Sequence, residues 1–380
     1  MKVSLNWIKD YVKLPADMDL KKLAYDLTMS TVEVEDAEEL GKRFDGIVVG
    51  VIKEVLPHPN ADKLRVCRTD IGGGEIKEIV CGGSNLEVNQ KVAVAVPGTF
   101  VKWHGEGEPV EIKVSKLRGV ESYGMICAST EIGLEDLFPL GGEHEILNLN
   151  AFECEAGDPI AKALNLDDVI LEIDNKSMTN RPDLWGHYGI AREIATLYDL
   201  PLEPIAEIIP EAEGGIDIRI GDSERCRRFI GTKMEGLYVK ESPFEMQTRL
   251  WRVGVRPINA LVDVTNYVML ATGQPTHAYD KDHIVDFISA RMAQEGEKLV
   301  LLSGEELELN TDDLVIADAT GPVGLAGVMG GLNSEIKETT TEVLFEAAKF
   351  LKDSVRKTSR GLGLRSDSAA RFEKGIDRLW

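Results

Sequence analysis

The spacing of hydrophobic positions changes along the chain, and each change predicts a different kind of structure. Residues 5–27 predict helix, because the apolar side chains of DLKKLAYDL recur at i, i+3, i+4 and i+7 after a capping Asp19. From about 40 to 150 the chain has short Val- and Ile-rich runs separated by Gly, Pro and Asn: GIVVGVIKEV, KLRVCRTDI, EIKEIVC, KVAVAV and VEIKVSKL. Five such runs favour a small barrel of the OB type.

A mixed pattern returns after the β-rich stretch. Val169, Leu171 and Ile173 alternate as in a strand, and PDLWGHYGIAREIATLYDL predicts a long helix that begins at Pro182. A loose stretch, LPLEPIAEIIPEAEGG, follows residue 200 and favours the start of a new unit. Within that unit GIDIRI predicts a strand, and SPFE reads as a capping box with Pro at the first helical position.

The β runs ISARMA, KLVLLS and DLVIAD, between 288 and 317, predict a small β insert. At 380 residues the chain exceeds the size at which single cores stop growing, so several domains are expected. We therefore predict an α+β multidomain protein. Its predicted parts are a discontinuous mixed N-terminal domain (1–39 with 152–198), an inserted barrel (40–151), and a third domain (200–380) with an insert at about 287–318.

Composition narrows the possible partners. The chain has 43 Lys and Arg against 65 Asp and Glu, a net charge of −22, which argues against general affinity for nucleic-acid backbones, DNA included, or for anionic membranes. The five cysteines are odd in number, far apart and free of CxxC pairs, which disfavours disulfides and structural zinc. No secretion signal and no run of about 18 apolar residues is present. We expect a cytoplasmic protein without a membrane partner.

Two groups of residues suggest chemistry. GQPTHAYD places His277 three residues before Asp280, which invites a general-base interpretation, although closeness in sequence does not make a proton relay. In the predicted barrel, the basic residues supply local positive charge on a fold that commonly binds oligonucleotides, although charged strand residues are more often a solvated face. These basic residues are Lys53, Lys63, Arg65 and Arg68.

The order of longer motifs carries a family resemblance. HPNADKLRVCRTDIG, VCGGSNLEVNQKVAVAVPG and KLRGVESYGMICASTEIGL resemble, in that order, the tRNA-binding OB domain of several tRNA-associated proteins. With the segments that follow, the chain resembles the N-terminal half of bacterial phenylalanyl-tRNA synthetase beta subunits over essentially all 380 residues. Those segments are NRPDLWGHYGIAREIA, RPINALVDVTNYVMLATGQPTHAYD, GLAGVMGG, VLFEAA and GLGLRSDSAARFEKGID.

The resemblance implies an α/β editing domain with an SH3-like β insert, which hydrolyses tyrosine wrongly esterified to phenylalanine tRNA. It implies catalytic roles for Thr265, Asn266 and His277, and leaves Asp280 structural. It implies substrate contacts by Ala326, Gly327 and Glu346.

These residue types suit the task. An aminoacyl ester is already reactive, so orienting a water and the carbonyl is enough, and Thr, Asn and His can do so. Glycine lets the backbone approach a ligand closely. Glu346, among apolar neighbours, can accept a hydrogen bond from a tyrosine hydroxyl. A site built to bond a hydroxyl rejects the analogue that lacks it by roughly 10⁴-fold or more.

Plainer interpretations remain open at each of these positions. A histidine after a proline is most often structural or on the surface, and the Glu of an FEAA sequence is more often a charge at a helix start. Thr265 and Asn266 are able simply to cap or bond the backbone, and GLAGVMGG is compatible with a turn-rich strand.

Residues 349–374 form the most positive stretch of the chain, with eight Lys or Arg against three acids. One interpretation is a phosphate-facing surface for the acceptor end of tRNA, formed by Arg356, Lys357 and Arg360. The alternative is a solvated pair of helices joined by GLGL.

No ATP-binding signature is present, because GGGEIKE and GGSNLE lack the spacing of a phosphate loop or a dinucleotide fingerprint. We expect no cofactor or metal in this chain, and ATP and magnesium only for a complete enzyme that includes an alpha subunit. The chain ends at FEKGIDRLW, before the later beta domains of the family, and Arg378 stands where the family continuation is expected to change. We therefore expect a truncated beta subunit.

Three functions remain at this stage. The first is an esterase that removes tyrosine from phenylalanine tRNA, and the second is a non-catalytic tRNA-binding module. A third is a role unrelated to tRNA for an acidic, β-rich protein.

Overall fold

The computed structural model describes residues 1–15, 17–206 and 215–376. It divides into two compact units, which we call unit 1 (Met1–Ala37 with Leu171–Trp380) and unit 2 (Glu38–Ile170). Part of the loose stretch predicted after residue 200 (207–214) and Arg378 lie outside the described residues. The predicted mixture of α and β elements is confirmed, and the predicted domain bounds stay a prediction.

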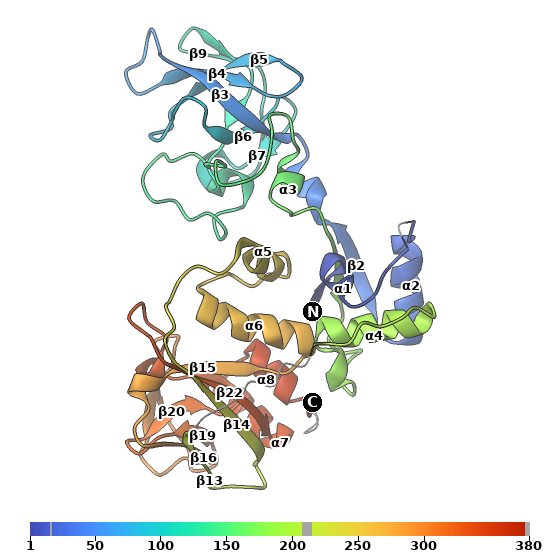
Figure 1. The fold of residues 1–380 in the computed structure, drawn as a ribbon, viewed down its shortest axis with the longest axis vertical. Helices are drawn as coiled ribbons and strands as arrows, with labels where there is room; N and C mark the ends of the chain where they lie inside the picture. Colours follow the sequence, from blue (N-terminus) through green and yellow to red (C-terminus); the bar gives the residue numbers. More distant parts are fainter. Residues whose placement is uncertain (16, 207–214, 377–380) are drawn as a thin grey trace. The chain divides into compact units, whose positions relative to one another are not determined.

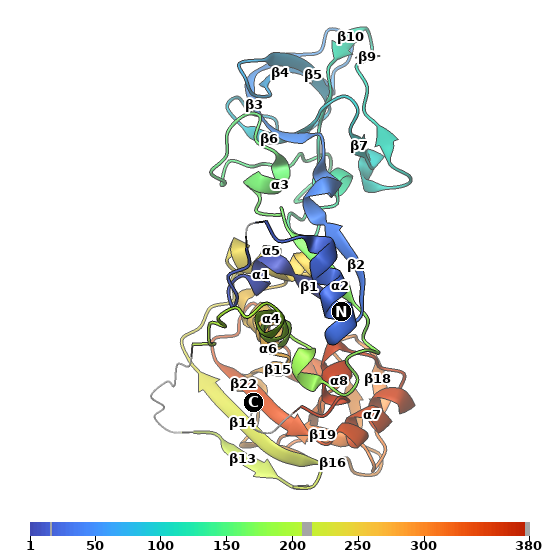
Figure 2. The same ribbon diagram turned by 90° about the vertical axis from the view of Figure 1, so that its right-hand side faces the viewer.

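Unit 2 is built around a five-stranded antiparallel sheet in the order β11-β6-β3-β4-β5. Its outer strands come together, because the Tyr123 amide next to β11 donates a hydrogen bond of 2.9 Å to the Glu78 carbonyl in β5. The sheet is therefore nearly closed (Figure 2), which agrees with the predicted OB-like barrel. The strands are β3 (Ile47–Pro57), β4 (Arg65–Asp70), β5 (Ile76–Cys81), β6 (Lys91–Ala95) and β11 (Met125–Ile126).

The prediction that VEIKVSKL is the fifth barrel strand is wrong. It splits into β8 (Val110–Glu111), which pairs with β7 (Phe100–Val101), and β9 (Ser115–Leu117), which pairs with β10 (Val120–Ser122). Only Ile112 of its apolar residues is buried, whereas Val110 and Val114 are about half exposed. A run with one buried position cannot form a wall of the barrel. The short helices of unit 2 are η1 (Leu40–Phe44), η2 (Trp103–Gly105), η3 (Thr130–Ile132) and α3 (Ile160–Ala163).

The chain start forms a small sheet in the order β1-β12-β2, from β1 (Lys2–Ser4), β12 (Val169–Ile173) and β2 (Val34–Glu39). The single helix predicted over 5–27 is instead α1 (Leu5–Ile8) and α2 (Leu20–Ser30). The chain between them is held away from helix at Val12, which bridges to Leu202. The cap of α2 is confirmed, since the Asp19 carboxylate accepts the Lys21 and Lys22 amides.

The helix predicted from Pro182 begins later, at α4 (His187–Leu197), after a 3₁₀ turn, η4 (Pro182–Leu184). Gly186 separates the two and packs on Gly273, where a Cβ would lie 2.4 Å from the Gly273 nitrogen. The backbone turns at this close contact, so the helix cannot run through it.

The remainder of unit 1 is built on two larger sheets, and its first two helices are α5 (Phe244–Arg252) and α6 (Ala260–Thr272). The first sheet has the order β14-β22-β15, and α6 lies along β15 (Figure 1). Its strands are β14 (Cys226–Met234), β22 (Val343–Phe350) and β15 (Thr276–Asp280). The capping box predicted at SPFE is wrong, because the Ser242 hydroxyl donates to the buried Asp263 carboxylate in α6 and leaves α5 without a side-chain cap.

The second sheet has the order β13-β16-β19-β20-β21. Two of the three runs assigned to a β insert, β16 and β19, belong to this sheet, which extends beyond 287–318 on both sides. The insert as bounded from the sequence stays a prediction. The strands are β13 (Asp217–Ile220), β16 (Phe287–Met292), β19 (Leu314–Ala317), β20 (Pro322–Leu325) and β21 (Met329–Gly330), with the separate pair β17 (Lys298–Val300) and β18 (Glu306–Glu308).

One hydrophobic core joins the two sheets to the last helices of unit 1. These helices are α7 (Lys352–Gly361) and α8 (Asp367–Phe372), and the short turns of this region are η5 (Lys281–His283) and η6 (Leu332–Ser334). Phe350 at the end of β22 packs on Phe372 of α8 with ring centroids 5.1 Å apart. This packing places α8 beside the loop that follows β20.

Candidate functional site

A cavity of about 480 Å³ lies within unit 1. Its wall is formed by α6, β15, β22, the chain from β20 to β21, and the start of α8. Five of the six residues predicted for the editing pocket line it, although they come from four separate segments: Thr265, Asn266, His277, Gly327 and Glu346. The sixth, Ala326, is buried in the core and is absent from the cavity wall.

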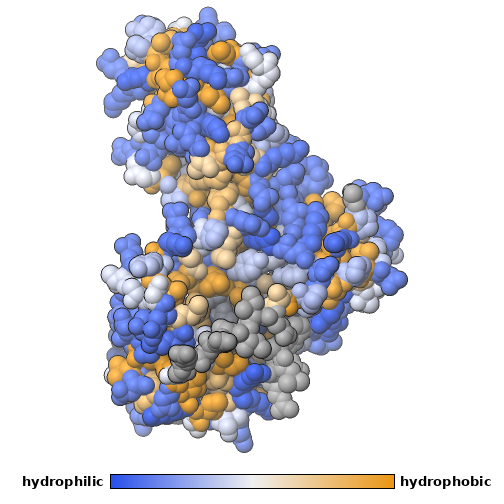
Figure 3. All heavy atoms as spheres, in the orientation of Figure 1, coloured by the Kyte–Doolittle hydropathy of each residue, from blue (hydrophilic) through white to orange (hydrophobic). Residues whose placement is uncertain are grey.

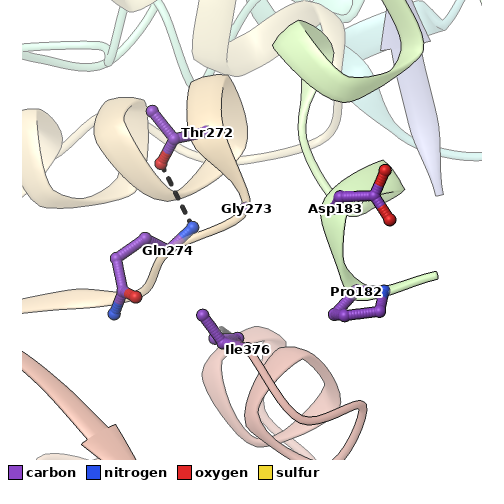
Figure 4. Close-up of a pocket in the computed structure, with 6 residues that line it drawn as sticks. All are labelled: Pro182, Asp183, Thr272, Gly273, Gln274 and Ile376. Atoms are coloured by element: carbon purple, nitrogen blue, oxygen red, sulfur yellow. Dashed lines mark hydrogen bonds between the residues drawn. The ribbon is translucent and has the colours of Figure 1, made fainter. Parts of the chain in front are cut away.

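A second hollow, of about 10 Å³, has room for no more than one water molecule. In it the Gln274 amide donates a hydrogen bond of 3.1 Å to the Thr272 hydroxyl (Figure 4). Its small size excludes it as a ligand site. The residues around it are Pro182, Asp183, Thr272, Gly273, Gln274 and Ile376.

Helix α6 supplies two polar groups to the large cavity. Asn259 caps the helix by accepting the Leu261 and Val262 amides, which fixes where its first turn begins. One turn later the Thr265 hydroxyl donates to the Val262 carbonyl at 2.7 Å, so its oxygen lone pairs remain able to accept. Asn266 is half-buried, and its amide group has no hydrogen-bond partner among the described residues.

Strand β22 places one carboxyl group in an apolar face. Its inward positions are Leu344, Glu346, Ala348 and Phe350, and Glu346 is the only polar residue of the four. His277 lies directly opposite Glu346 in the antiparallel pair of β15 and β22. Cross-strand partners share a face of the sheet, so the two side chains belong to the same wall of the cavity.

Glu346 is only 7% exposed, and burial raises the pKa of its carboxyl group to about 7. The buried hydroxyl of Tyr279 donates a hydrogen bond to Oε2 of this group, which lowers the pKa by a smaller amount. Burial and the neighbouring carboxyl raise the pKa of Tyr279 well above its usual value. Oε1 has no hydrogen-bond partner among the described residues, so one acceptor of Glu346 is left for a ligand.

Burial lowers the pKa of His277 to about 4, so its imidazole is neutral at pH 7. The ring meets the Tyr279 ring edge to face, with centroids 4.5 Å apart and planes at 74°. Gly330 makes room for it, since a Cβ at that position would lie 2.5 Å from both Cε1 and Nε2 of His277. Neither ring nitrogen has a hydrogen-bond partner in the described part of the chain.

Gly327 and the residues after it form the opposite wall. Gly327 has a φ of 71°, and a Cβ there would meet Phe372 at 2.9 Å and Phe350 at 3.0 Å. Two hydroxyls of α8 hold this loop: Ser368 donates to the Gly327 carbonyl at 3.0 Å, and Ser366 donates to the Val328 carbonyl at 2.6 Å. Serines in the SDS sequence, rather than the nearby arginines, therefore shape the cavity.

Asp280 is not a partner of His277. In the same strand it points to the opposite face, and its carboxylate accepts hydrogen bonds from the Thr340 hydroxyl at 2.6 Å and the Asp282 amide at 3.1 Å. The structural role given to Asp280 is confirmed, and the two-residue relay is excluded.

Sequence reasoning missed Gly330 and Tyr279. The period of a strand was the available signal for Tyr279, because two residues after His277 a side chain returns to the same face. Gly330 stands in the quoted GLAGVMGG, but only the packing of the His277 ring shows why a glycine is needed there.

The basic residues predicted for RNA contact in the barrel differ in whether the protein already supplies them with ion-pair or hydrogen-bond partners. Lys53 lies at a bulge of β3 and pairs with Asp70 at 3.6 Å, and Arg68 pairs with Glu54 at 3.0 Å. Arg65 donates to the carbonyls of Asp62 and Leu64 at 2.8 and 2.9 Å. Lys63 is exposed, without an ion pair in the described part of the chain.

On α7, Arg356, Lys357 and Arg360 are all exposed. Lys357 pairs with Asp312 at 2.6 Å, whereas the two arginines have no ion pair among the described residues. This face of α7 keeps the positive charge that its sequence predicted.

Two searches of the described residues bear on metals and membranes. No group of three or more His, Cys, Asp or Glu there is arranged to hold a metal ion. None of the helices there has the length and apolar character needed to cross a bilayer.

Two family models match the chain. Residues 47–150 match the model described as "Putative tRNA binding domain", and residues 225–379 match "B3/4 domain". The first covers the barrel of unit 2, and the second covers the cavity of unit 1. The chain is thus of the class that combines a barrel matching the putative tRNA binding domain with a region matching the B3/4 domain.

Comparison with individual relatives shows which family within this class the chain resembles. The chain is 39% identical to the phenylalanine–tRNA ligase beta subunit of Trichormus variabilis, over 100% of the chain and 46% of that protein. Identity is 42% with the beta subunit of Halalkalibacterium halodurans (99% and 46% covered) and 40% with that of Chlorobaculum tepidum (99% and 45%). The chain therefore belongs to the phenylalanine–tRNA ligase beta subunit family, which confirms the resemblance predicted from its motifs.

The chain spans a little under half the length of the curated relatives it matches. Among solved structures, the crystal structure of an N-terminal fragment of the phenylalanyl-tRNA synthetase beta subunit from Pyrococcus horikoshii is 16% identical. That match covers 56% of this chain and 63% of the fragment, with a TM-score of 0.29.

Proposed function

We propose that this chain binds phenylalanine tRNA and hydrolyses tyrosine that has been wrongly esterified to it, in the cavity of unit 1. The observation that carries the proposal is that five residues from four distant segments meet in the wall of one cavity of about 480 Å³. This volume falls in the range of small-molecule sites.

The polar groups of the wall suit a ligand because the protein leaves them without partners. The Asn266 amide, the His277 imidazole and Oε1 of Glu346 all lack hydrogen-bond partners within the described residues. Buried polar groups are nearly always hydrogen-bonded, so unpaired groups around a cavity indicate a site that water or a ligand completes.

In the proposed reaction a water oxygen attacks the ester carbonyl carbon, and the bond from that carbon to the ribose oxygen breaks. Tyrosine and free tRNA are released, with the water protons going to the ribose oxygen and the new carboxyl group. Thr265, Asn266 and His277 hold the water and the carbonyl in line. Since the pKa of His277 is about 4, orienting the water by hydrogen bonding is favoured over taking its proton.

Glu346 gives the site its preference for tyrosine. Its Oε1 accepts the substrate hydroxyl, while Oε2 is held by Tyr279. A phenylalanyl group would displace water from Oε1 and offer no donor in return, which leaves a buried acceptor unpaired. The correct ester is therefore spared, by roughly 10⁴-fold or more on the scale of sites that bond a hydroxyl.

The barrel and α7 supply the contacts to tRNA in this proposal. Lys53, Lys63, Arg65 and Arg68 lie on unit 2, and Arg356, Lys357 and Arg360 lie on α7. Aminoacylation itself requires an alpha subunit with ATP and magnesium, as expected for the complete ligase, and the protein acts in the cytoplasm. No step of the hydrolysis proposed here uses a metal or ATP.

Incubating the chain with tyrosyl-tRNA and phenylalanyl-tRNA, and following loss of each ester, tests the proposal. Faster loss of the tyrosyl ester alone is expected, and Glu346→Ala should abolish it. Glu338→Ala, which removes an exposed glutamate outside the cavity, is the matched control and should act like the unchanged chain.

Tight tRNA binding without cleavage of either ester would instead favour the non-catalytic binding module. Unchanged deacylation by Glu346→Ala would remove Glu346 from the proposal.

A further inference from the structure

The hairpin of β9 and β10 in unit 2 has a turn that its sequence does not favour. Leu117 pairs with Val120, so the turn consists of Arg118 and Gly119 alone. Both have positive φ, 47° and 93°, as in a type I′ turn. Glycine adopts such angles without strain, but the first position of this turn favours Asn, Asp or Gly, and a long side chain there is disfavoured.

Side chains of the loop after β3 hold this turn in place. Asn60 donates from Nδ2 to the Arg118 carbonyl at 3.0 Å. The buried His58 donates from Nε2 to the Leu117 carbonyl at 3.1 Å, and its Nδ1 accepts the Asn60 amide at 3.0 Å. Two of these hydrogen bonds thus hold a backbone conformation that arginine disfavours, and the third orients the His58 ring. Strain that the surroundings maintain in this way is typical of functional positions.

The side chain of Arg118 does not contribute to that stabilisation. It is exposed, and within the described residues it has neither an ion pair nor a side-chain hydrogen bond. Lys63, in the loop after β3, and Lys116, on β9, are also exposed, and neither has an ion pair within the described residues. Lys53 and Arg68, by contrast, have acidic partners. Hydrophilic residues cover much of the visible face of this unit (Figure 3), and Figure 2 shows β9 and β10 at its edge.

An uncompensated guanidinium is suited to phosphate. Its planar fork of donors matches phosphate oxygens, and it is weakly hydrated compared with a lysine ammonium. In a chain with a net charge of −22, the cations that are not already neutralised decide where a polyanion can approach. Phosphate contacts of this kind position a nucleic acid without reading its sequence.

We infer that Arg118 is a phosphate-contacting residue for RNA, presented at the tip of the β9–β10 hairpin, with Lys63 and Lys116 as its neighbours in the contact. The inference rests on the tRNA-binding part of the proposed function, and it moves the main RNA contact of the barrel away from Lys53 and Arg68. Asn60 and His58 are positioning residues, since they act through the turn.

Arg118→Asn separates this role from a structural one, because asparagine is favoured at the first position of a type I′ turn. The variant should unfold at the same or a higher temperature than the unchanged chain. Its affinity for an unmodified phenylalanine tRNA transcript, followed by fluorescence anisotropy, should fall about 10-fold, and the slope of log K against log salt should fall by about one. Arg43→Asn, which removes a cation of unit 2 already paired with Glu38, is the control and should change affinity less than about twofold.

The outcomes distinguish this inference from the proposed function. No tRNA binding by the unchanged chain would overturn the tRNA-binding proposal and this inference with it. Binding by the unchanged chain, with the same affinity and salt slope for Arg118→Asn, would overturn the inference alone. A lower unfolding temperature for Arg118→Asn would also overturn it, because the arginine would then serve the fold.

Discussion

The hydroxyl of Tyr279 donates a hydrogen bond to Oε2 of Glu346, and both side chains are buried in the wall of the cavity. A phenol of the protein thus already makes the kind of contact that we propose for the phenol of the substrate. The bond fixes which carboxylate oxygen faces the cavity. It also limits the site to one further hydroxyl, because only Oε1 remains without a protein partner within the described residues.

Tyr279→Phe should shift the pH dependence of deacylation. The hydrogen bond from Tyr279 lowers the pKa of Glu346, so its loss should raise that pKa above about 7. The activity against tyrosyl-tRNA that depends on ionised Glu346 should then appear at a higher pH and be about 10-fold lower at pH 7. The measurement is kcat/KM from pH 5.5 to 9.

Other titratable groups of that wall do not account for such a shift. His277 has a pKa of about 4. Burial, and to a smaller extent the charge of Glu346, raise the pKa of Cys226 in β14 to about 12, so neither group titrates near pH 7. Tyr238→Phe, at a tyrosine that is 79% exposed, serves as the control. An unchanged pH profile for Tyr279→Phe would contradict the positioning role of its hydroxyl.

Glu346→Gln should stabilise the protein at high pH while damaging hydrolysis. Folded Glu346 keeps its proton up to about pH 7, whereas unfolded glutamate loses it near 4.5. The folded state therefore binds more protons between these values, and stability falls as the pH rises through them. Glutamine, which can still accept from Tyr279, avoids that loss of about 3 kcal/mol.

Urea unfolding at pH 4.5 and pH 8 measures this difference. Glu346→Gln should match the unchanged chain near pH 4.5 and unfold at higher urea concentration at pH 8. The exposed Glu338→Gln should show no such pH dependence. An equal urea midpoint for Glu346→Gln and the unchanged chain at pH 8 would show that ionisation of the buried carboxyl group does not destabilise the folded protein.

Local signals in the sequence predicted most of the elements correctly. Asp19 caps α2 because its carboxylate bonds amides two and three residues away. The Val-rich runs of β3 to β6 become strands because β-branched residues suit a pleated surface and each run has several residues to bury. The prediction for VEIKVSKL was wrong because hydrophobicity alone does not show which apolar residues become buried in the barrel. Ser242 failed as a cap because Asp263, 21 residues away, competes for its hydroxyl.

The sequence indicated which residues belong to the candidate site, but it did not predict the contacts that these residues make. His277 and Glu346 were named, yet their direct pairing follows from strand register, which the sequence does not specify. Lys53 and Arg68 were chosen for charge alone, and cross-strand acids neutralise both. Arg118 was passed over, although a KLRGV hairpin with arginine before glycine is an unfavourable turn sequence in its own right.

Gly330→Ala should remove deacylation without weakening tRNA binding. The added methyl would lie 2.5 Å from Cε1 and Nε2 of His277, so the ring must leave its place beside Tyr279. A displacement of about 1 Å at such a site can cost roughly 100-fold in rate. We expect that loss in single-turnover hydrolysis of tyrosyl-tRNA.

The control for Gly330→Ala is Gly361→Ala, where an added Cβ meets nothing within 4 Å. It should hydrolyse the ester as the unchanged chain does, and both variants should keep the same tRNA affinity. Full activity in Gly330→Ala would show that the position of the His277 ring does not matter to the reaction.

Substitution by glutamine at pH 7 should affect stability differently at His277 and His187, although burial lowers the pKa of each to about 4. His187 has both nitrogens bonded: Nδ1 donates to the Leu270 carbonyl at 2.7 Å, and Nε2 accepts the Ser4 amide at 3.1 Å. His187→Gln should therefore destabilise the protein at pH 7, by about 1–3 kcal/mol for the groups left unpaired. His277→Gln loses no protein hydrogen bond and should be close to neutral at pH 7.

At acidic pH, His277→Gln should become more stable than the unchanged chain. The unfolded histidine takes up a proton below about pH 6.5, whereas the folded one stays neutral to about pH 4, so protons favour the unfolded chain between these values. His277→Gln removes this penalty and should be the more stable protein at pH 4. The expected gain is about 2 kcal/mol, below the full value for the shift because the cavity side of the ring stays hydrated. Urea midpoints at pH 7 and pH 4 measure it, and a difference between His277→Gln and the unchanged chain that does not vary with pH would contradict a neutral, ligand-facing imidazole.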